Sequence, residues 1–225
     1  MAEVRKITSG VASLALWKIE EDEAFLKSYI DGDSFPVLAR LKDENRRLEW
    51  LATRCCLRVL GINDSIIYKP NRRPFLSKGR HHISITHSFP YVAVLSSARF
   101  FVGVDIESTE RPFKRIADKY LTLGEKGWID LDDKYAMAIV WSAKEALYKL
   151  PGMEGLNSFE DVTVLPLRKV EDHGQLQLRV RLGGLVQKFS MEYAFFDSFV
   201  ITWVSCNPSL MEWHKLKPEY ATREE

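Results

Sequence analysis

Two carboxylates, Asp105 and Glu107, stand one residue apart in the string Val-Gly-Val-Asp-Ile-Glu at residues 102–107. Alternate side chains of a β-strand point to opposite faces, so the three apolar residues can share a buried face while Gly103, Asp105 and Glu107 share the other. Two carboxylates on one face repel each other unless a cation lies between them. Mg²⁺ usually takes one or two protein carboxylates together with water and substrate phosphate oxygens. The string therefore indicates a magnesium site or, alternatively, ordinary acids at a solvated strand end.

A second string with chemical potential reads Trp-Ser-Ala-Lys-Glu-Ala-Leu-Tyr-Lys at residues 141–149. Glu145 and Lys149 are four residues apart, and Trp141 lies one turn earlier, so a helix places all three on one face. Taken alone, this spacing also fits a surface Glu–Lys pair worth about 0.2–0.5 kcal/mol, with Trp141 in the core.

A histidine among hydroxyl groups forms the third string, Ser-Ile-Thr-His-Ser at residues 84–88. His87 stands where a predicted strand ends in a turn at Pro90, and the preceding residues 69–80 carry five cations and no acid. Arginine and histidine N–H groups suit phosphate oxygens. The string fits either a structural histidine or a phosphate-binding one.

The elements that must position these residues alternate between helices and strands. The apolar spacing predicts a strand at 11–19, a helix at 43–60 ended near Gly61, strands at 82–86, 91–96 and 100–107, a helix at 133–150, and strands from 162 to 206 with a hairpin at residues 183–184. We therefore expect an α+β fold made of a pseudo-twofold pair of similar lobes, each with a small antiparallel sheet and packed helices. The N-terminal lobe is expected at 1–100, and 101–225 forms the lobe with the acidic motifs.

Composition narrows the possible partners. The chain has 225 residues with 32 basic and 31 acidic side chains, so its net charge of +1 supplies no global field for nucleic acid. Its three cysteines show no CxxC spacing, which argues against a zinc site or a disulfide framework. No apolar run is long enough to span a bilayer. These features predict a soluble, cytoplasmic protein with no membrane or nucleic-acid partner.

The order of the motifs carries a family resemblance. A basic residue with proline, a Thr-His-Ser turn, a Gly-Val-Asp-x-Glu strand and a Trp-Ser-x-Lys-Glu-Ala-x-x-Lys helix follow one another between residues 45 and 165. This order resembles the surfactin-synthetase-type 4′-phosphopantetheinyl transferases, whose two lobes hold coenzyme A between them. The resemblance implies a monomeric, Mg²⁺-dependent holo-[acyl-carrier-protein] synthase. It would move the 4′-phosphopantetheine group of coenzyme A to a serine of an apo acyl or peptidyl carrier protein and release adenosine 3′,5′-bisphosphate.

The resemblance also implies roles for individual residues. The Mg²⁺ ligands would be Asp105, Glu107 and Glu145, and the catalytic residues Glu145, as a base acting directly or through water, and Lys149. The coenzyme A contacts would be Arg47, Arg54, Arg73, Thr86, His87 and Lys144. Arg72-Arg73-Pro74 stands where the family usually has Gly-Lys-Pro, so the charge is kept and the glycine is lost.

Other interpretations of the same residues stay open. The acids with Lys149 could form a metal-dependent nuclease or phosphodiesterase site, although such sites usually place the acid and lysine two apart on a strand. A noncatalytic carrier-binding homologue is a further alternative. Between Arg111 and Trp128, a carrier-binding patch could form, or these residues could be ordinary core and surface. The candidates for that patch are Phe113, Lys114, Arg115 and Tyr120.

Overall fold

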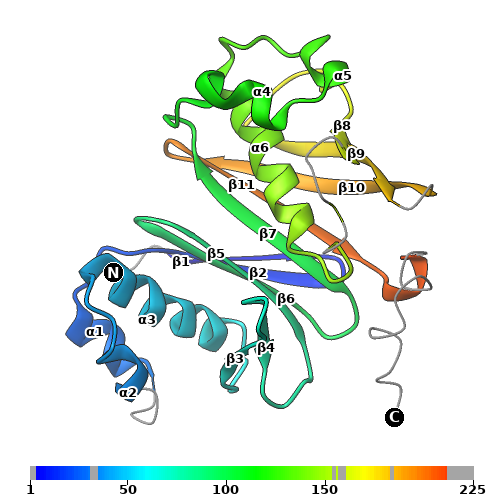
Figure 1. Cartoon of the computed structure of the whole chain (residues 1–225). Helices are drawn as coiled ribbons and strands as arrows, with labels where there is room; N and C mark the ends of the chain where they lie inside the picture. The colour runs from blue at the N-terminus through cyan, green and yellow to red at the C-terminus, as the bar shows by residue number, and fades with distance from the viewer. Residues whose placement is uncertain (1–3, 31–34, 154–155, 157–160, 183–184, 212–225) are drawn as a thin grey trace. The chain divides into compact units, whose positions relative to one another are not determined.

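The computed structural model describes residues 4–30, 35–153, 156, 161–182 and 185–211. The chain divides into two compact units, Met1–Ala98 and Arg99–Glu225, which are described separately (Figure 1). Both units combine small antiparallel sheets with helices, which confirms the predicted α+β class. The pseudo-twofold relation between lobes stays a prediction. No helix in these described ranges is long and apolar enough to cross a membrane.

The N-terminal unit is built on a four-stranded antiparallel sheet in the order β1-β2-β6-β5, with a separate β3-β4 hairpin. Its elements are β1 (Val4–Ser9), β2 (Ala12–Lys18), α1 (Glu23–Ser28), α2 (Phe35–Leu38), α3 (Glu44–Val59), β3 (Ile66–Tyr68), β4 (Pro74–Leu76), β5 (His82–Ser88) and β6 (Tyr91–Ser97).

Helix α3 is fixed at both ends by local signals. The Asp43 side chain accepts a hydrogen bond from the Arg46 backbone N–H at 2.8 Å, which caps the first turn. Gly61 follows the last turn with φ +76°, a left-handed conformation that glycine adopts without strain. Between these ends, Leu51 and Cys55 are buried in the core that α3 shares with β2 and β6.

The C-terminal unit has a five-stranded antiparallel sheet in the order β7-β11-β10-β9-β8. Its elements are β7 (Phe101–Ser108), η2 (Phe113–Ile116), α4 (Ala117–Tyr120), α5 (Leu123–Lys126), α6 (Lys134–Tyr148), β8 (Val162–Val164), β9 (His173–Leu182), β10 (Leu185–Phe196), β11 (Phe199–Cys206) and η4 (Pro208–Leu210). The predicted turn at residues 183–184 lies outside the described residues, and the flanking strands β9 and β10 pair antiparallel.

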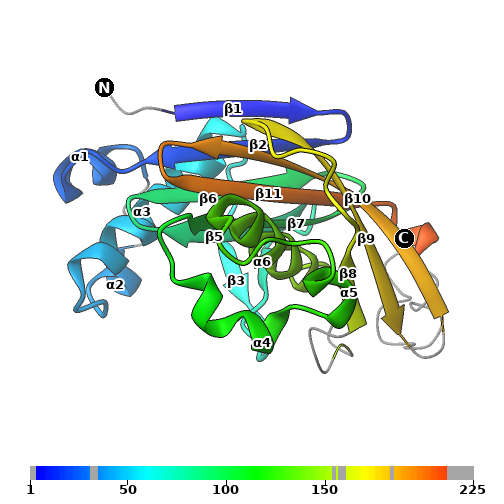
Figure 2. The same ribbon diagram turned by 90° about the horizontal axis from the view of Figure 1, so that it is seen from above.

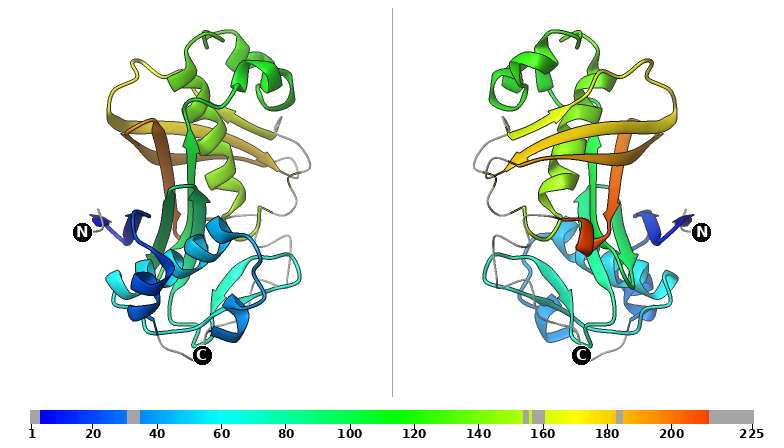
Figure 3. Two further views of the ribbon diagram at one scale, coloured as in Figure 1. Left: turned by 90° about the vertical axis from the view of Figure 1, so that its left-hand side faces the viewer. Right: turned by 90° about the vertical axis from the view of Figure 1, so that its right-hand side faces the viewer.

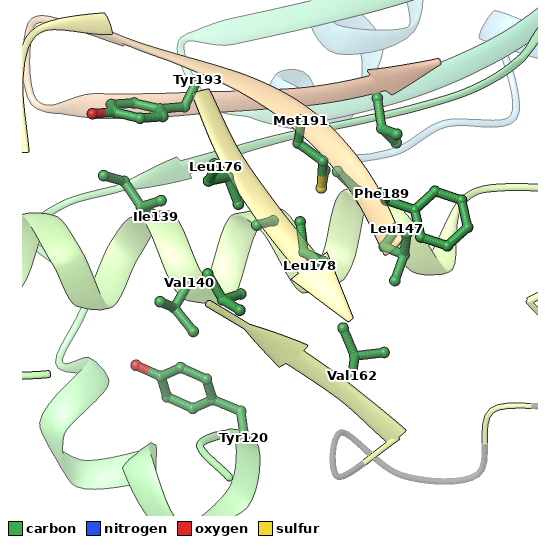
Figure 4. Packing of buried hydrophobic residues seen from close by; sticks show 14 of the residues in the cluster. Tyr120, Ile139, Val140, Leu147, Val162, Leu176, Leu178, Phe189, Met191 and Tyr193 are labelled. Atoms are coloured by element: carbon green, nitrogen blue, oxygen red, sulfur yellow. The ribbon is translucent and has the colours of Figure 1, made fainter. Parts of the chain in front are cut away.

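Helix α6 lies along β7 and β11 and forms the centre of this unit's core (Figure 3). Ile139 and Leu147 of α6 share one cluster with Leu176 and Leu178 of β9 and Phe189 of β10 (Figure 4). Helix α4 lies on the side of α6 away from β11 (Figure 2). Because α6 is packed on two sides, its polar residues can leave the core only at restricted positions.

The aromatic residues considered for a carrier-binding patch are part of this core. Phe113 and Tyr120 are 2% and 1% exposed, and their rings lie 6.1 and 5.1 Å from the Trp141 ring between centroids. The exposed Lys114 pairs with Asp132 at 2.6 Å. Burial of large rings stabilises the fold. Phe113 and Tyr120 are therefore core residues, which is one of the two alternatives that the sequence left open.

Candidate functional site

Glycine at position 103 allows the backbone of α6 to approach β7. A Cβ atom on Gly103 would lie 2.1 Å from the carbonyl oxygen of Ala146, which is closer than any real side chain permits. One turn before Ala146, Ser142 Oγ donates to the Asp105 carbonyl oxygen at 3.3 Å and lies 2.9 Å from Thr202 Oγ1. The space that glycine leaves beside the acids is therefore filled by the helix backbone, which brings the acidic strand and the acidic helix together.

Asp105 and Lys149 form the first polar contact between these two elements. Asp105 is 8% exposed, and Lys149 caps the C-terminus of α6. Lys149 Nζ donates to Asp105 Oδ1 at 2.8 Å and to the Val104 carbonyl oxygen at 2.9 Å. Two acceptors on one strand fix the direction of the ammonium group, so the cation is held in place beside the carboxylate.

Glu145, one turn before Lys149, carries an unusually basic carboxylate. Burial raises the pKa of Glu145, and the nearby Asp105 carboxylate raises it further, whereas Lys149 and Arg111 lower it in part. The carboxylate of Glu107 is a smaller contribution that also raises this pKa. A half-buried carboxylate among other carboxylates has a high affinity for a proton or for a cation.

The Glu107 carboxylate is paired with an arginine, Arg111, which the sequence did not predict as its partner. Arg111, four residues later, forms an ion pair with the Glu107 carboxylate, and its guanidinium lies 4.4 Å from the centre of the Trp141 ring. Across the described ranges, no group of three His, Cys, Asp or Glu side chains is arranged to hold a metal ion. The turn after β7, in which the Arg111 N–H donates to the Ser108 carbonyl oxygen, brings Arg111 back to Glu107, and the available sequence signal was the preference of arginine for aromatic faces.

Lys144 lies apart from these acids, inside the core. Its ammonium is 0% exposed and donates to the Tyr120 carbonyl oxygen at 2.6 Å and to Glu125 Oε2 at 2.7 Å. Glu125 also accepts the backbone N–H groups of Thr122 and Val164, both at 2.7 Å. This buried network joins α5, α6 and β8, and the lysine predicted to contact coenzyme A is one of its members.

The N-terminal unit holds a pocket of about 310 Å³ lined by cations and aromatic rings. His87 lines it from β5, and Arg46, Trp50 and Arg54 line it from α3. The Arg54 guanidinium lies 3.3 Å from the centre of the Trp50 ring, and burial lowers the pKa of Arg54 to about 10. Even with this shift Arg54 is charged at neutral pH, so the pocket suits an anionic ligand.

The other predicted coenzyme A contacts do not line this pocket. They are Arg47, Arg73, Thr86 and Lys144. Arg47 donates to both carboxylate oxygens of Glu23, at 2.7 and 2.5 Å, and so ties α1 to α3. Thr86 is 5% exposed. Arg73 accepts the Lys69 N–H through its carbonyl oxygen, whereas Arg72, at φ +63°, lines the pocket.

The sequence interpretation missed Arg46 and Glu49, which both line the pocket. Arg46, Glu49, Trp50 and Thr53 stand at i, i+3, i+4 and i+7 and therefore share one face of α3, whereas Arg47 is rotated about 100° away from that face. The helical period alone could have separated Arg46 from Arg47.

Comparison with known proteins identifies the acidic segment. A model described as the 4′-phosphopantetheinyl transferase superfamily matches residues 101–203, the segment from β7 to β11 that carries Asp105, Glu145 and Lys149. The chain therefore carries a domain of the 4′-phosphopantetheinyl transferase superfamily, as its motifs predicted. No curated protein matches the chain. The assignment to the surfactin-synthetase-type branch stays a prediction.

Proposed function

We propose that this protein transfers the 4′-phosphopantetheine group of coenzyme A to a serine of an apo acyl or peptidyl carrier protein in a Mg²⁺-dependent reaction. The observation that supports it best is the meeting of Asp105, Glu145 and Lys149 where α6 approaches β7. These residues lie within the segment that matches the transferase superfamily. The predicted monomeric state and cytoplasmic location belong to the same proposal.

The donor set fits a hard divalent cation. Mg²⁺ needs only one or two protein carboxylates when phosphate oxygens and water complete its shell, and Asp105 is close enough to Glu145 to raise the pKa of Glu145. Glu107 would join them if its pair with Arg111 opened. When bound by Asp105, Glu145 and Glu107, Mg²⁺ would neutralise negative charge on the pyrophosphate of coenzyme A.

The chain's own residues would carry the proton and orient the charges. The carrier serine oxygen attacks the β-phosphorus of coenzyme A, the P–O bond to adenosine 3′,5′-bisphosphate breaks, and the serine proton passes to Glu145, directly or through water. Glu145 lies beside Asp105 at the same junction as Lys149, so its carboxylate is placed to accept this proton. Lys149 would place its ammonium near the leaving oxygen, and its bonds to β7 mean that little reorganisation is needed.

In this proposal the cationic pocket of the N-terminal unit binds a phosphate group of coenzyme A. His87 was predicted as a phosphate contact, and Arg46 lies with its Nη1 3.3 Å from His87 Nε2. A phosphate there would accept charge-assisted hydrogen bonds, which are about twice as strong as neutral ones.

The experiment is intact-mass spectrometry of an apo acyl carrier protein incubated with the protein, coenzyme A and Mg²⁺. We expect the carrier to gain the mass of one phosphopantetheine group, and we expect EDTA to abolish the gain. A panel of acyl and peptidyl carriers would identify the partner. A folded protein that binds coenzyme A but modifies no carrier would support the noncatalytic alternative, and Mg²⁺-dependent nicking of plasmid DNA would support the nuclease alternative.

A further inference from the structure

A buried carboxylate in the N-terminal unit has no role in the chemistry described so far. Glu49 lies on α3, is 8% exposed, and its Oε2 atom is buried without a hydrogen bond of regular geometry to any residue that the structure describes. An ionised carboxylate removed from water is costly unless nearby charges compensate it. The position of Glu49 therefore requires an explanation from the groups around it.

Two groups face this oxygen, and both belong to the cationic pocket. His87 Nδ1 lies 3.3 Å from Glu49 Oε2, and Arg46 Nη1 lies 3.5 Å from the same atom. Arg46 Nη1 is also 3.3 Å from His87 Nε2. The three side chains therefore contact one another pairwise: the carboxylate lies near one ring nitrogen of His87, the guanidinium lies near the other, and the carboxylate and guanidinium also lie near each other.

Among the described residues that line the pocket, the remaining charges are the cations Arg54 and Arg72, and Glu49 is the one acid. A carboxylate in a pocket suited to anions lowers its attraction for a ligand, so a general electrostatic role for Glu49 would work against binding. A local role that acts through the histidine has no such conflict, because the hydrogen bond at one ring nitrogen fixes the tautomer and orientation of the other.

We propose that Glu49 is a positioning residue that accepts the Nδ1–H of His87 and so directs His87 Nε2 to the place where a phosphate oxygen of coenzyme A binds. In the ligand-free protein Arg46 lies against this nitrogen. When the phosphate arrives it takes the place of His87 Nε2 as a partner of Arg46, His87 Nε2 takes up a proton from solvent, and the adjacent Glu49 carboxylate stabilises the imidazolium. This inference rests on the proposed coenzyme A binding.

The first test uses the free protein and does not depend on coenzyme A. Long-range ¹H–¹⁵N spectra of the histidine side chains, with the His87 signals assigned from a His87→Gln variant, report which ring nitrogen carries a proton. We expect Nδ1 to be protonated in the wild type. In Glu49→Met, which removes the acceptor but keeps a side chain of similar size, neutral His87 should shift toward the Nε2–H tautomer. A wild-type His87 that is protonated at Nε2 alone would overturn the proposal.

The second test separates positioning from stability. Met at position 49 removes a buried charge, so the Tm of Glu49→Met should be no lower than that of the wild type. Its KM for coenzyme A should nevertheless rise about tenfold, with kcat changed by less than about twofold. Glu44 is an exposed acid in the first turn of the same helix. Glu44→Met is therefore the matched control and should leave KM and kcat unchanged.

A double-mutant cycle then decides whether Glu49 acts through His87. If it does, Glu49→Met should add nothing to the loss caused by His87→Ala, whereas independent contributions would add. Additive losses would contradict the proposal. A wild-type protein that does not bind coenzyme A would remove the proposed function but leave the spectroscopic result on Glu49 and His87 valid, so the two failures are distinguishable.

Discussion

The two units use one strand–helix–strand arrangement for opposite kinds of charge. In each unit the strand that precedes the long helix pairs with the unit's last strand, β2 with β6 and β7 with β11, and the long helix packs on that pair. In the N-terminal unit, β2 contributes Ala15 and Trp17 to the core beneath α3. In the C-terminal unit, β7 offers Gly103 and Asp105 to α6. The two strands therefore differ in what they present to the long helix: β2 presents core side chains, whereas β7 presents a glycine and a carboxylate.

The polar groups of the N-terminal unit gather elsewhere and are mainly cationic. Three arginines and His87 line its pocket together with one described acid, Glu49, whereas the β7–α6 junction combines three carboxylates with the cations Lys149 and Arg111. One unit is therefore suited to phosphate and the other to a metal ion or a proton. The predictions below test this division.

The largest effect is expected from Glu145→Gln, which removes the proposed base and metal ligand of the C-terminal unit. Phosphopantetheine transfer should fall about 10³-fold. The measurement is the initial rate of carrier modification by mass spectrometry at saturating coenzyme A. Near-normal transfer would refute the mechanism.

The Tm of Glu145→Gln shows whether this variant is correctly folded, and the direction of its change follows from the pKa of Glu145. Because the pKa of Glu145 is raised in the folded protein, its contribution to stability is present below the unfolded pKa and is lost as pH rises through the folded value. The metal-free Glu145→Gln protein should therefore have a higher Tm than metal-free wild type at pH 7. The difference should shrink as pH falls below about 4.5. A lower Tm at pH 7 would mean that the loss of transfer reflects misfolding.

Lys144 of α6 and its C-cap residue Lys149 provide a matched pair for comparing fold stability with activity. Lys144→Met leaves Glu125 buried without its ammonium partner, and breaking a buried ion pair costs about 3–5 kcal/mol. Urea denaturation should show this loss. A Glu125→Gln/Lys144→Met double variant should lose less than the two single variants combined, since the uncompensated charge is gone. Additive losses would show that the pair is not coupled.

Lys149→Met tests the other lysine of the pair. Its ammonium is 30% exposed beside Asp105, so the loss of stability should be below that of Lys144→Met. Transfer should fall about 10²-fold, as expected when one stabilising charge is removed. Rates and urea midpoints for both lysine variants should therefore rank in opposite orders. Identical rankings would contradict the assignment of one lysine to the fold and the other to the site.

The sequence predicted those features that depend on local period and on order along the chain. The strand at 100–107, the helix at 133–150 and the proximity of their acids followed from alternation, helical spacing and motif order. The environment of Lys144 did not follow, because its partner Glu125 is 19 residues away and only the packing of α5 and β8 on α6 brings them together. Alternation placed Gly103 on the same face as the acids, but only the packing of α6 shows that the helix backbone occupies the position beside it.

Gly103→Ala makes β7 resemble β2, which has Ala15 at a helix-facing position, and so tests the comparison directly. The added methyl group would meet the Ala146 carbonyl oxygen at 2.1 Å, so α6 must shift. We expect a loss of about 1–3 kcal/mol and a clear loss of transfer, measured on the same preparation. Gly124→Ala, where the added Cβ would lie 3.8 Å from Thr122 Oγ1, is the control. Equal effects of the two substitutions would show that the close approach is unimportant.

The smallest effect is expected at Glu23, in the N-terminal unit. Hydrogen bonds from Arg47 and then Lys27 lower the pKa of Glu23 to about 2, so this pairing contributes stability above the unfolded pKa of 4.5 that is lost as pH falls toward 2. Since the pair is partly exposed, the contribution should be below about 1 kcal/mol. Thermal melts of wild type and Glu23→Gln should differ at pH 6 and converge near pH 2. Transfer at neutral pH should be unchanged, because Arg46, and not Arg47, lines the cationic pocket. A rise in the KM for coenzyme A in this variant would instead return Arg47 to the binding site.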